Sequence, residues 1–426
     1  MKKVFERSMY IILDLYIFKS LIIKVFQKEK IMKILIADKL SEKTVTDLKK
    51  MGAIVTVNPD LKAEDLPNAI GETEILIVRS TQVTKSTIEA GKMLSLIIRA
   101  GSGVNTIDLK TASEKGIHVA NCPGKNTAAV AELTMGLMIS ADRRLVSATQ
   151  SLIAGQWQKK EFGKAYGLKN RTLGIIGFGS IGKAVAKTAQ SLDMKVVAYS
   201  RSLTPEIAKD HEIEFCKSIH ELAQKSDVVS VHTAYKPETK HIINQEFLAK
   251  MKDGAIFINT SRGELVDSQA LLQAIKTKKI KVGLDVFENE PVGGVASFEQ
   301  KELASLITCT PHVGASTDQA AEAIADEVAR IVQVYQETGR PLHVVNIRKK
   351  TSAIINLVVR HYNRVGVLAG VLDNLRTVGV NIEEMENTVF DGGLAASCTL
   401  KLDQNLPSEI FAKIKNDPNI IQVMVK

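Results

Sequence analysis

Cysteine is scarce in this chain of 426 residues. Its four cysteines, Cys122, Cys216, Cys309 and Cys398, lie far apart and form no CxxC pair. This spacing excludes a disulfide framework, and no metal site is predicted. We therefore expect a reducing, cytoplasmic environment in which the thiols are buried as small apolar side chains.

Long apolar runs are also missing. The apolar segment at residues 1–31 is interrupted by Asp14, Lys19 and Lys24, and no small-residue cleavage site follows it. No stretch reaches the ~18 consecutive apolar residues of a membrane span. Because MKILIA, from Met32, is typical of the first strand of a domain, we interpret residues 1–31 as a dispensable extension or an upstream start. A peripheral amphipathic anchor is the alternative.

The sequence has no basic stripe of the kind found in nucleic-acid-binding proteins. The formal net charge is +9, and residues 1–32 contribute +4 of it through seven Lys or Arg against three acids. The remaining +5 is interspersed with acidic residues. This distribution favours small anionic ligands over nucleic acid.

A glycine loop, GFGSIG at 177–182, is the strongest single motif. An apolar run at 172–176 precedes it, a helical stretch at 183–192 follows it, and a second apolar run occupies 195–199. The glycines at G-x-G-x-x-G spacing are Gly177, Gly179 and Gly182. In a βαβ context they permit a tight turn, close approach of a pyrophosphate, and close helix packing. The motif predicts a dinucleotide site.

The type of nucleotide is open on this evidence. A site for NAD usually ends its second strand with Asp or Glu, whereas this chain has Ser200 followed by Arg201. Arg201 could pair with the 2′-phosphate of NADP, or it could be a solvated side chain beside a serine-bound ribose.

From Met32 onward, short apolar runs alternate with helical stretches, which is typical of a parallel α/β fold. Five runs come first, at 33–37, 53–57, 74–78, 95–99 and 117–120. Six more surround and follow the glycine loop, at 172–176, 195–199, 228–232, 255–259, 281–285 and 306–310. A helix at 126–149 joins the two sets, and a helix at 316–338 is expected to return to the first, which would make that domain discontinuous.

The tail has a different order of elements. Residues 339–351 contain the Gly, Pro and basic residues of a linker. Strands are then expected at 353–360, 380–389, 394–402 and 420–426, with helices at 365–378 and 408–415. This βαββαβ order is ferredoxin-like and indicates a module for ligand sensing or association.

Three charged residues, Arg262, Glu290 and His312, come after apolar runs downstream of the glycine loop. Ligands of an open α/β sheet bind outside the carboxyl ends of its strands, so these side chains are expected to converge on one substrate. A neutral imidazole with a pKa near ~6.5 can accept a hydroxyl proton, a carboxylate can hold the ring, and a guanidinium can bind an anionic oxygen.

Several longer motifs resemble those of a known family. They are VRST at 78–81, RAGSGVNTID at 99–108, GFGSIG at 177–182, NTSRGELVD at 259–267, GLDVFENEP at 283–291, TPHVGAST at 310–317, and HYNRVGVL with GVNI in the tail. From about Met32 to Lys426 the chain resembles the D-isomer-specific 2-hydroxyacid dehydrogenases, and closely the 3-phosphoglycerate-oxidising branch with a C-terminal ACT domain.

The resemblance implies an α/β fold with three domains. They are a discontinuous flavodoxin-like substrate domain at 32–125 and 313–340, a Rossmann NAD-binding domain at 126–312, and, after a linker at 341–351, a ferredoxin-like ACT domain at 352–426. It also implies catalytic roles for Arg262, Glu290 and His312, with His312 transferring the proton.

Further contacts are implied residue by residue. Those to the nucleotide are Gly177, Gly179, Ser180, Ile181, Gly182, Ser200, Thr260, Ser261, Arg262, Asp285, His312, Val313 and Gly314. Those to the substrate are Arg79, Ser80 and Asn126, and those to an amino-acid effector are His361, Asn363 and Asn381.

The expected function is oxidation of 3-phospho-D-glycerate to 3-phosphooxypyruvate with NAD, in a homotetramer inhibited by L-serine bound between paired ACT domains. Neither a nucleic-acid nor a membrane partner is expected. Two alternatives stay open: an NADP-dependent glyoxylate or hydroxypyruvate reductase, and a catalytically silent nucleotide sensor resembling the family's transcriptional corepressors.

Overall fold

The computed structural model describes residues 31–291, 296–348 and 351–426 of the chain. They form two compact units, one ending at Asn346 and one beginning at Ile347. The extension expected at residues 1–31 lies outside the described residues except for Ile31. Among the helices of the described ranges, none combines the length and apolar character required to cross a membrane.

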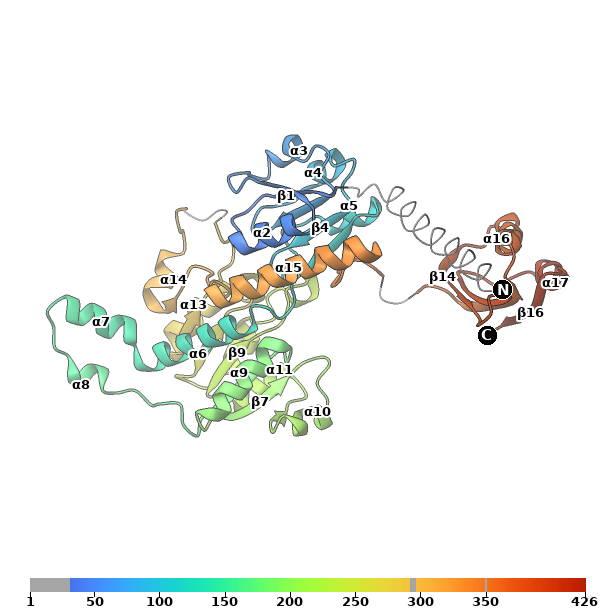
Figure 1. Ribbon diagram of the computed structural model, residues 1–426. Helices are drawn as coiled ribbons and strands as arrows, with labels where there is room; N and C mark the ends of the chain where they lie inside the picture. Colours follow the sequence, from blue (N-terminus) through green and yellow to red (C-terminus); the bar gives the residue numbers. More distant parts are fainter. Residues whose placement is uncertain (1–30, 292–295, 349–350) are drawn as a thin grey trace, which may run out of the picture. The chain divides into compact units, whose positions relative to one another are not determined.

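The first sheet contains five parallel strands in the order β2-β1-β3-β4-β5 (Figure 1). Its strands are β1 (Lys33–Ile36), β2 (Ile54–Val57), β3 (Ile75–Val78), β4 (Leu96–Arg99) and β5 (His118–Asn121). The helices between them are α2 (Glu42–Lys50), α3 (Leu66–Ala69), α4 (Lys85–Ala90) and α5 (Leu109–Glu114). This flavodoxin-like order confirms the parallel α/β unit that the sequence predicts.

A long helix, α15 (Asp318–Thr338), returns to this first sheet late in the sequence. It packs against α2, and its buried Ile324, Val328 and Ile331 share a core cluster with strand residues such as Ile34. The hydroxyl of Thr317 caps its start by accepting a hydrogen bond from the N–H of Ala320 at 3.2 Å. The first domain is therefore discontinuous, as its sequence indicates.

The second sheet contains seven parallel strands in the order β12-β11-β10-β9-β6-β7-β8. Its strands are β6 (Thr172–Ile176), β7 (Lys195–Tyr199), β8 (Glu214–Phe215), β9 (Val228–Val231), β10 (Ile256–Asn259), β11 (Lys281–Leu284) and β12 (Thr308–Cys309). The arrangement around β6, with β7 on one side and β9 on the other, is Rossmann-like. Sequence analysis missed β8, which is too short to produce a recognisable pattern.

Six helices and two short 3₁₀ turns connect these strands. They are α9 (Ser180–Ser191), α10 (Pro205–Asp210), α11 (Ile219–Lys225), α12 (Gln245–Lys250), α13 (Ser268–Lys278) and α14 (Lys301–Leu306), with η1 (Pro237–Thr239) and η2 (Gly263–Leu265). Strands β9 and β10 are buried along their whole length, as expected for strands covered on both faces. Cys122, Cys216 and Cys398 are buried and unpaired, whereas Cys309 is half-buried.

Two helices, α6 (Thr127–Arg143) and α7 (Leu145–Ile153), replace the single helix expected at 126–149. The break lies at Arg144, whose φ of 52° is in the left-handed region. The guanidinium of Arg144 donates a hydrogen bond to Glu161 Oε1 at 2.6 Å. A left-handed residue ends a helix, so α7 leaves in a new direction.

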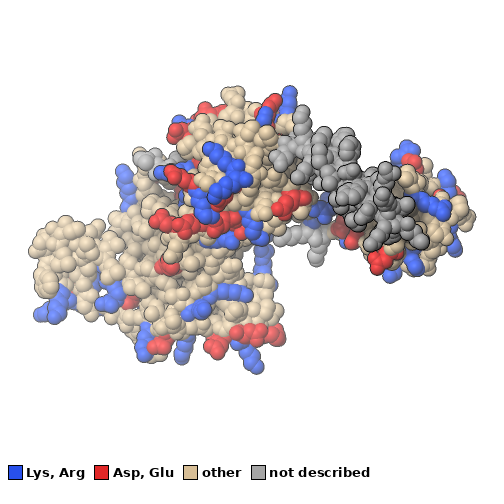
Figure 2. Space-filling model, in the orientation of Figure 1, with Lys and Arg blue, Asp and Glu red and all other residues tan. Residues whose placement is uncertain are grey.

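We call residues 145–166, which contain α7 and α8 (Lys159–Phe162), the arm. It extends away from the second sheet, at the left of Figures 1 and 2. Helix α7 contains no buried residue and no charged side chain. The arm exposes large apolar side chains at Leu145, Val146, Leu152, Ile153, Trp157 and Tyr166. By contrast, basic and acidic residues are interspersed over the rest of the first unit on the face that Figure 2 shows.

The second unit is a single antiparallel sheet with two helices. Its strands lie in the order β14-β15-β13-β16. Its elements are β13 (Ile355–Tyr362), α16 (Val367–Thr377), β14 (Ile382–Val389), β15 (Ala395–Leu402), α17 (Ser408–Lys415) and β16 (Ile420–Val425). The expected ferredoxin-like βαββαβ order is confirmed.

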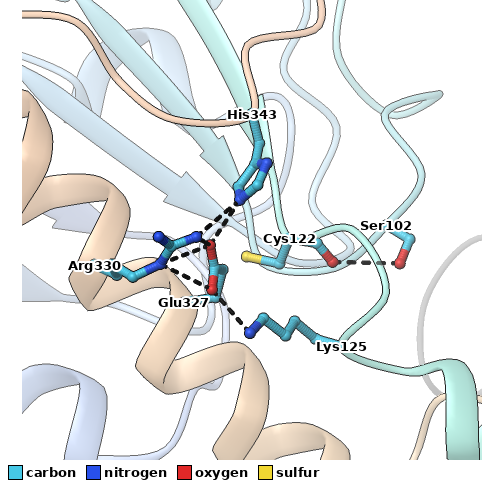
Figure 3. Close-up of polar contacts among 6 residues, drawn as sticks. All are labelled: Ser102, Cys122, Lys125, Glu327, Arg330 and His343. Carbon is cyan, nitrogen blue, oxygen red and sulfur yellow. Dashed lines mark hydrogen bonds and ion pairs between the residues drawn. The ribbon is translucent and has the colours of Figure 1, made fainter.

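Glu327 on α15 is a buried carboxylate among three basic side chains (Figure 3). It pairs with Lys125 at 2.9 Å, Arg330 at 2.6 Å and His343 at 2.8 Å. Burial favours the neutral acid, but the hydrogen bonds from the three basic partners outweigh it and lower the pKa of Glu327 to about 2. Lys125 lies just before α6 and His343 just after α15, so this carboxylate ties α15 to the segment that leads into α6 and to the segment that follows α15.

Replacing Glu327 with Gln is expected to lower the free energy of unfolding at neutral pH by about 2 kcal/mol, because the charge-assisted hydrogen bonds are lost. Folding lowers the pKa of Glu327 from 4.5 to about 2, so the stabilisation is present above pH 4.5 and is lost as the pH falls toward 2. Urea unfolding of wild type and Glu327→Gln at pH 7 and at pH 3 measures this difference, which should shrink at the lower pH.

Glu322→Gln is a matched control, because Glu322 lies on the same helix without being buried. It should unfold within about 0.5 kcal/mol of wild type. A deficit of the same size at both pH values for Glu327→Gln would contradict the electrostatic account.

Candidate active site

The three side chains predicted to act together lie beyond the carboxyl ends of adjacent strands of the second sheet. Arg262 follows β10, Glu290 follows β11, and His312 follows β12. The Nδ1 of His312 donates a hydrogen bond to Oε2 of Glu290 at 2.6 Å. These residues therefore converge as expected from the strand ends of a parallel sheet.

Glu290 is held as a carboxylate. Burial favours its neutral form, but the hydrogen bonds from His312 and the Phe287 N–H, with a smaller contribution from the positive charge of Arg262, outweigh burial and lower the pKa of Glu290. Its Oε1 accepts a hydrogen bond from the N–H of Phe287 at 3.0 Å. With both carboxylate oxygens engaged, the ring of His312 is fixed, and among the described residues its Nε2 has no hydrogen-bond partner.

The turn that carries His312 is held by Asp285, at the end of β11. Oδ1 of Asp285 accepts hydrogen bonds from Thr310 Oγ1 at 2.7 Å and from the N–H of Val313 at 2.8 Å. Oδ2 accepts one from the N–H of Gly314 at 2.8 Å. The carboxylate is buried, and His312 adopts a left-handed φ of 54°. Asp285, Val313 and Gly314, expected to contact the nucleotide, therefore build this turn.

The loop that carries Arg262 is fixed by the buried side chain of Asn259. Its Nδ2 donates to the carbonyl of Arg262 at 2.8 Å, and its Oδ1 accepts from the N–H of Ser261 at 3.0 Å. A side chain at Gly263 would place its Cβ 1.9 Å from the Phe287 carbonyl, so only glycine allows this close contact. The Arg262 loop is thereby packed against the segment that leads to Glu290.

The glycine loop has the geometry of a nucleotide cradle. Gly177 has a φ of 97°, and a Cβ there would lie 2.6 Å from the His232 backbone. A Cβ at Gly182 would lie 2.2 Å from the carbonyl oxygen of Gly177, so helix α9 packs closely on the loop. A Cβ at Gly179 would meet nothing within 4 Å and would project into open space. Helix α9 begins here, with Ser180 and Ile181 in its first turn, as an anion site at a helix N-terminus requires.

Other residues expected at the nucleotide lie at the ends of neighbouring strands, and several of them bond to other protein groups. Ser200 follows the end of β7, and Arg201 forms a long, exposed ion pair with Glu238 at 3.7 Å. The hydroxyl of Thr260 is within 2.8 Å of that of Thr134 on α6. Ser261 Oγ donates to the carbonyl of Val231 at 3.0 Å. Thr260 thus joins the end of β10 to α6, and Ser261 joins it to the neighbouring strand β9.

The residues expected at the substrate come from the first sheet. Arg79 and Ser80 follow β3, and their backbone N–H groups donate to Oδ2 of Asp38 at 2.6 and 3.1 Å. Asn126, at the start of α6, accepts a hydrogen bond from Ser102 Oγ at 2.7 Å. Sequence analysis missed Asp38, Ser102 and Asn259, although Asp38 could have been found because it follows the first strand.

The residues expected to bind an effector do not come together within one copy of the chain. His361 is buried, and its ring nitrogens contact the carbonyl of Tyr362 at 2.8 Å and Asn387 Oδ1 at 3.3 Å. Asn363 follows β13, and its Nδ2 donates to the carbonyl of Gly393 at 2.9 Å. Asn381 precedes β14, at the opposite end of the sheet, where its N–H donates to Asp403 at 2.9 Å.

Comparison with known proteins identifies the family of the first unit. Residues 135–314 match the model of the D-isomer specific 2-hydroxyacid dehydrogenase, NAD binding domain. A D-3-phosphoglycerate dehydrogenase of Methanocaldococcus jannaschii is 40% identical over 320 residues, which are 74% of this chain and 60% of that protein. A hydroxypyruvate reductase of Thermotoga maritima is 40% identical over 306 residues, which are 71% of this chain and 97% of that protein.

Solved structures agree on the fold. The TT0316 protein of Thermus thermophilus superposes with a TM-score of 0.67 at 31% identity, over 74% of this chain and all of that one. An NAD⁺-bound 3-phosphoglycerate dehydrogenase of Entamoeba histolytica superposes with a TM-score of 0.62 at 28% identity, over 74% of this chain and 99% of that one.

The matched motifs, the His312–Glu290 pair and the Rossmann sheet are all in place in one unit. The chain belongs to the D-isomer specific 2-hydroxyacid dehydrogenase family and contains the NAD-binding domain of that family.

Proposed function

We propose that the protein oxidises 3-phospho-D-glycerate to 3-phosphooxypyruvate with NAD, the reaction that begins L-serine biosynthesis. The observation that carries this proposal is the His312–Glu290 pair beside a group of arginines, with Arg262 on the second sheet and Arg79 on the first. Such a site suits a small alcohol that carries more than one negative charge. A D-3-phosphoglycerate dehydrogenase is among the similar proteins.

Oxidation removes a hydride from the alcohol carbon and a proton from its hydroxyl group. Bound NAD supplies the acceptor for the hydride. The Nε2 of neutral His312 is free to accept the hydroxyl proton, and the Glu290 carboxylate stabilises the imidazolium through Nδ1. Arg262 then stabilises the developing carbonyl oxygen or binds the substrate carboxylate.

NAD is proposed to lie along the glycine loop, with its pyrophosphate at Gly179 and the first turn of α9 and its ribose near Ser200. NAD is favoured over NADP because Arg201 is paired with Glu238, whose carboxylate would repel a 2′-phosphate. Thr260, Ser261, Val313 and Gly314 line the same carboxyl edge of the sheet.

A second candidate function is reduction of hydroxypyruvate or glyoxylate with NADPH. Two observations favour it: the similarity to a hydroxypyruvate reductase along almost all of that protein, and the absence of an acid at Ser200. This second candidate function gives no role to the C-terminal ferredoxin-like unit.

We further propose a homotetramer. The uncharged, apolar α7 of the arm is one surface available for pairing with a second copy. The edge strand β14 of the second unit is another, since it exposes Met385, Val389 and the adjoining Phe390. Two distinct self-complementary interfaces generate a tetramer with dihedral symmetry.

L-Serine is the proposed effector, bound between two ACT-like units. In one copy, His361 and Asn363 lie at one end of the sheet and Asn381 at the other, roughly 23 to 30 Å away at ~3.3 Å per residue of strand. If two β14 edges pair antiparallel about a twofold axis, Asn363 of one copy approaches the end that carries Asn381 in the other. Amide groups can bind both the carboxylate and the ammonium of an amino acid.

Steady-state reduction of 3-phosphooxypyruvate, with NADH and with NADPH, tests the main proposal. We expect kcat/KM to be at least about tenfold higher than with hydroxypyruvate, higher with NADH than with NADPH, and suppressed by L-serine. Preference for hydroxypyruvate or glyoxylate, with no response to serine, would instead support the reductase.

The substitution His312→Ala is expected to lower kcat about 10³-fold while leaving NADH binding largely intact, because only proton transfer is lost. Stopped-flow or steady-state turnover and NADH fluorescence titration give the two readouts. His241→Ala is a matched control, since His241 forms a similar 2.6 Å pair with Glu288 outside the proposed machinery. Near-normal kcat in His312→Ala would refute the role of His312.

Asn363→Ala is expected to raise the serine concentration required for half-inhibition about tenfold without changing kcat, since one hydrogen bond to the effector is lost. Serine titrations of wild type and variant measure it. Asn374→Ala, which alters an amide on α16 that bonds only within its own helix, is the control. Superimposable titration curves for wild type and Asn363→Ala would exclude that site.

A further inference from the structure

Arg99, the last residue of β4, lies half-buried at the carboxyl edge of the first sheet. Its Nε donates a hydrogen bond to the carbonyl oxygen of Arg79 at 3.1 Å. No other hydrogen bond of the Arg99 side chain is found among the described residues. The two terminal nitrogens of the guanidinium are therefore available to a ligand.

The neighbours of Arg99 are cations. Burial and the positive charges of Arg262 and Arg79 lower the pKa of Arg99 to about 10. Among the described residues, none of these three arginines has an ion-pair partner. The nearby acid, Asp38, already accepts three backbone N–H groups, those of residues 79 to 81, on a single oxygen.

Two glycines of the RAGSG segment leave space for the guanidinium groups of Arg99 and Arg262. Gly101 has a φ of 153°, and a Cβ there would lie 1.7 Å from a terminal nitrogen of Arg99. A Cβ at Gly103 would lie 2.3 Å from a terminal nitrogen of Arg262. The loop between them therefore contacts one arginine from each sheet. Because Gly101 and Gly103 have no side chains, the guanidinium groups of Arg99 and Arg262 can both lie against this loop.

This arrangement opposes folding. Like charges held together without a salt bridge repel one another, and a half-buried cation loses part of its hydration. A hydrophobic residue at position 99 would relieve both effects. Natural proteins retain such unfavourable clusters where binding or catalysis requires them, and three unpaired guanidinium groups are complementary to an anion that carries several charges.

We propose that Arg99 is a specificity-determining residue that binds the phosphate group of the substrate together with Arg79, while Arg262 binds the carboxylate end. This inference rests on the proposed function, because it assumes a phosphorylated 2-hydroxy acid. Near neutral pH a phosphate monoester carries about −1.5 to −2 charges, since its second pKa is near 6. Two arginines for the phosphate and one for the carboxylate match the charge of the substrate.

The experiment compares wild type, Arg99→Met and Arg99→Lys with 3-phosphooxypyruvate and with hydroxypyruvate, which lacks the phosphate. Arg99→Met should raise the KM for 3-phosphooxypyruvate about 30-fold and change the KM for hydroxypyruvate less than about threefold, as expected for loss of one charge-assisted contact. Arg99→Lys should show a smaller rise in this KM, because lysine keeps the positive charge but lacks the planar guanidinium that can donate two hydrogen bonds to a phosphate. Inorganic phosphate should inhibit hydroxypyruvate reduction competitively in wild type and about tenfold more weakly in Arg99→Met.

Arg340→Met is the matched control, since Arg340 is exposed at the end of α15 in the same unit. Thermal unfolding with and without NADH checks folding, and Arg99→Met should be no less stable than wild type. Equal losses with both substrates would mean that Arg99 only positions the Arg79 loop, which would overturn the inference. Retained preference for the phosphorylated substrate in Arg99→Met would overturn it too. If wild type itself shows no such preference and no phosphate inhibition, the proposed function fails instead.

Discussion

The buried carboxylate of Asp285 accepts three hydrogen bonds from the turn that carries His312. This interaction determines where the imidazole lies, because the turn has no regular secondary structure of its own. Glu290 then orients the ring through Nδ1, and Asn259 places Arg262 beside it. Each of these three supports is a buried or half-buried polar group whose partners are backbone groups, the Thr310 hydroxyl or a proposed catalytic side chain, so the protein's own hydrogen bonds make the site rigid.

Much of this could be predicted from the sequence. The apolar runs of β3, β9 and β10 are continuous because both faces of those strands are buried, and this makes them easy to recognise. The convergence of Arg262, Glu290 and His312 followed from the rule that strands of a parallel sheet end at one edge. The two-residue strand β8 and the left-handed break at Arg144 have no comparable pattern in the sequence.

The supporting residues were harder to predict than the ones they support. Asp285 and Gly314 were expected at the nucleotide, yet the N–H of Gly314 donates to Asp285, which also accepts hydrogen bonds from Thr310 and Val313. A sequence motif indicates that a residue is required, but it does not distinguish a residue that binds the nucleotide from one that stabilises a turn. The residues expected to bind an effector show a related limit of prediction from sequence. His361, Asn363 and Asn381 share one short module, but the antiparallel register places them at opposite ends of it. The proposed pairing of two copies would bring Asn363 of one copy near Asn381 of the other.

Family membership leaves the substrate open, because proteins named for phosphoglycerate and for hydroxypyruvate are equally similar to this chain, at 40% identity. 3-Phosphooxypyruvate and hydroxypyruvate have the same 2-oxo acid group, so the His312–Glu290 pair cannot discriminate between these substrates. Discrimination must come from contacts to the part of the substrate that does not react. In this chain that part would face the first sheet, where Arg79 and Arg99 lie without ion-pair partners among the described residues. A cluster of cations that costs stability and has no ion-pair partner among the described residues is the feature most informative about the ligand.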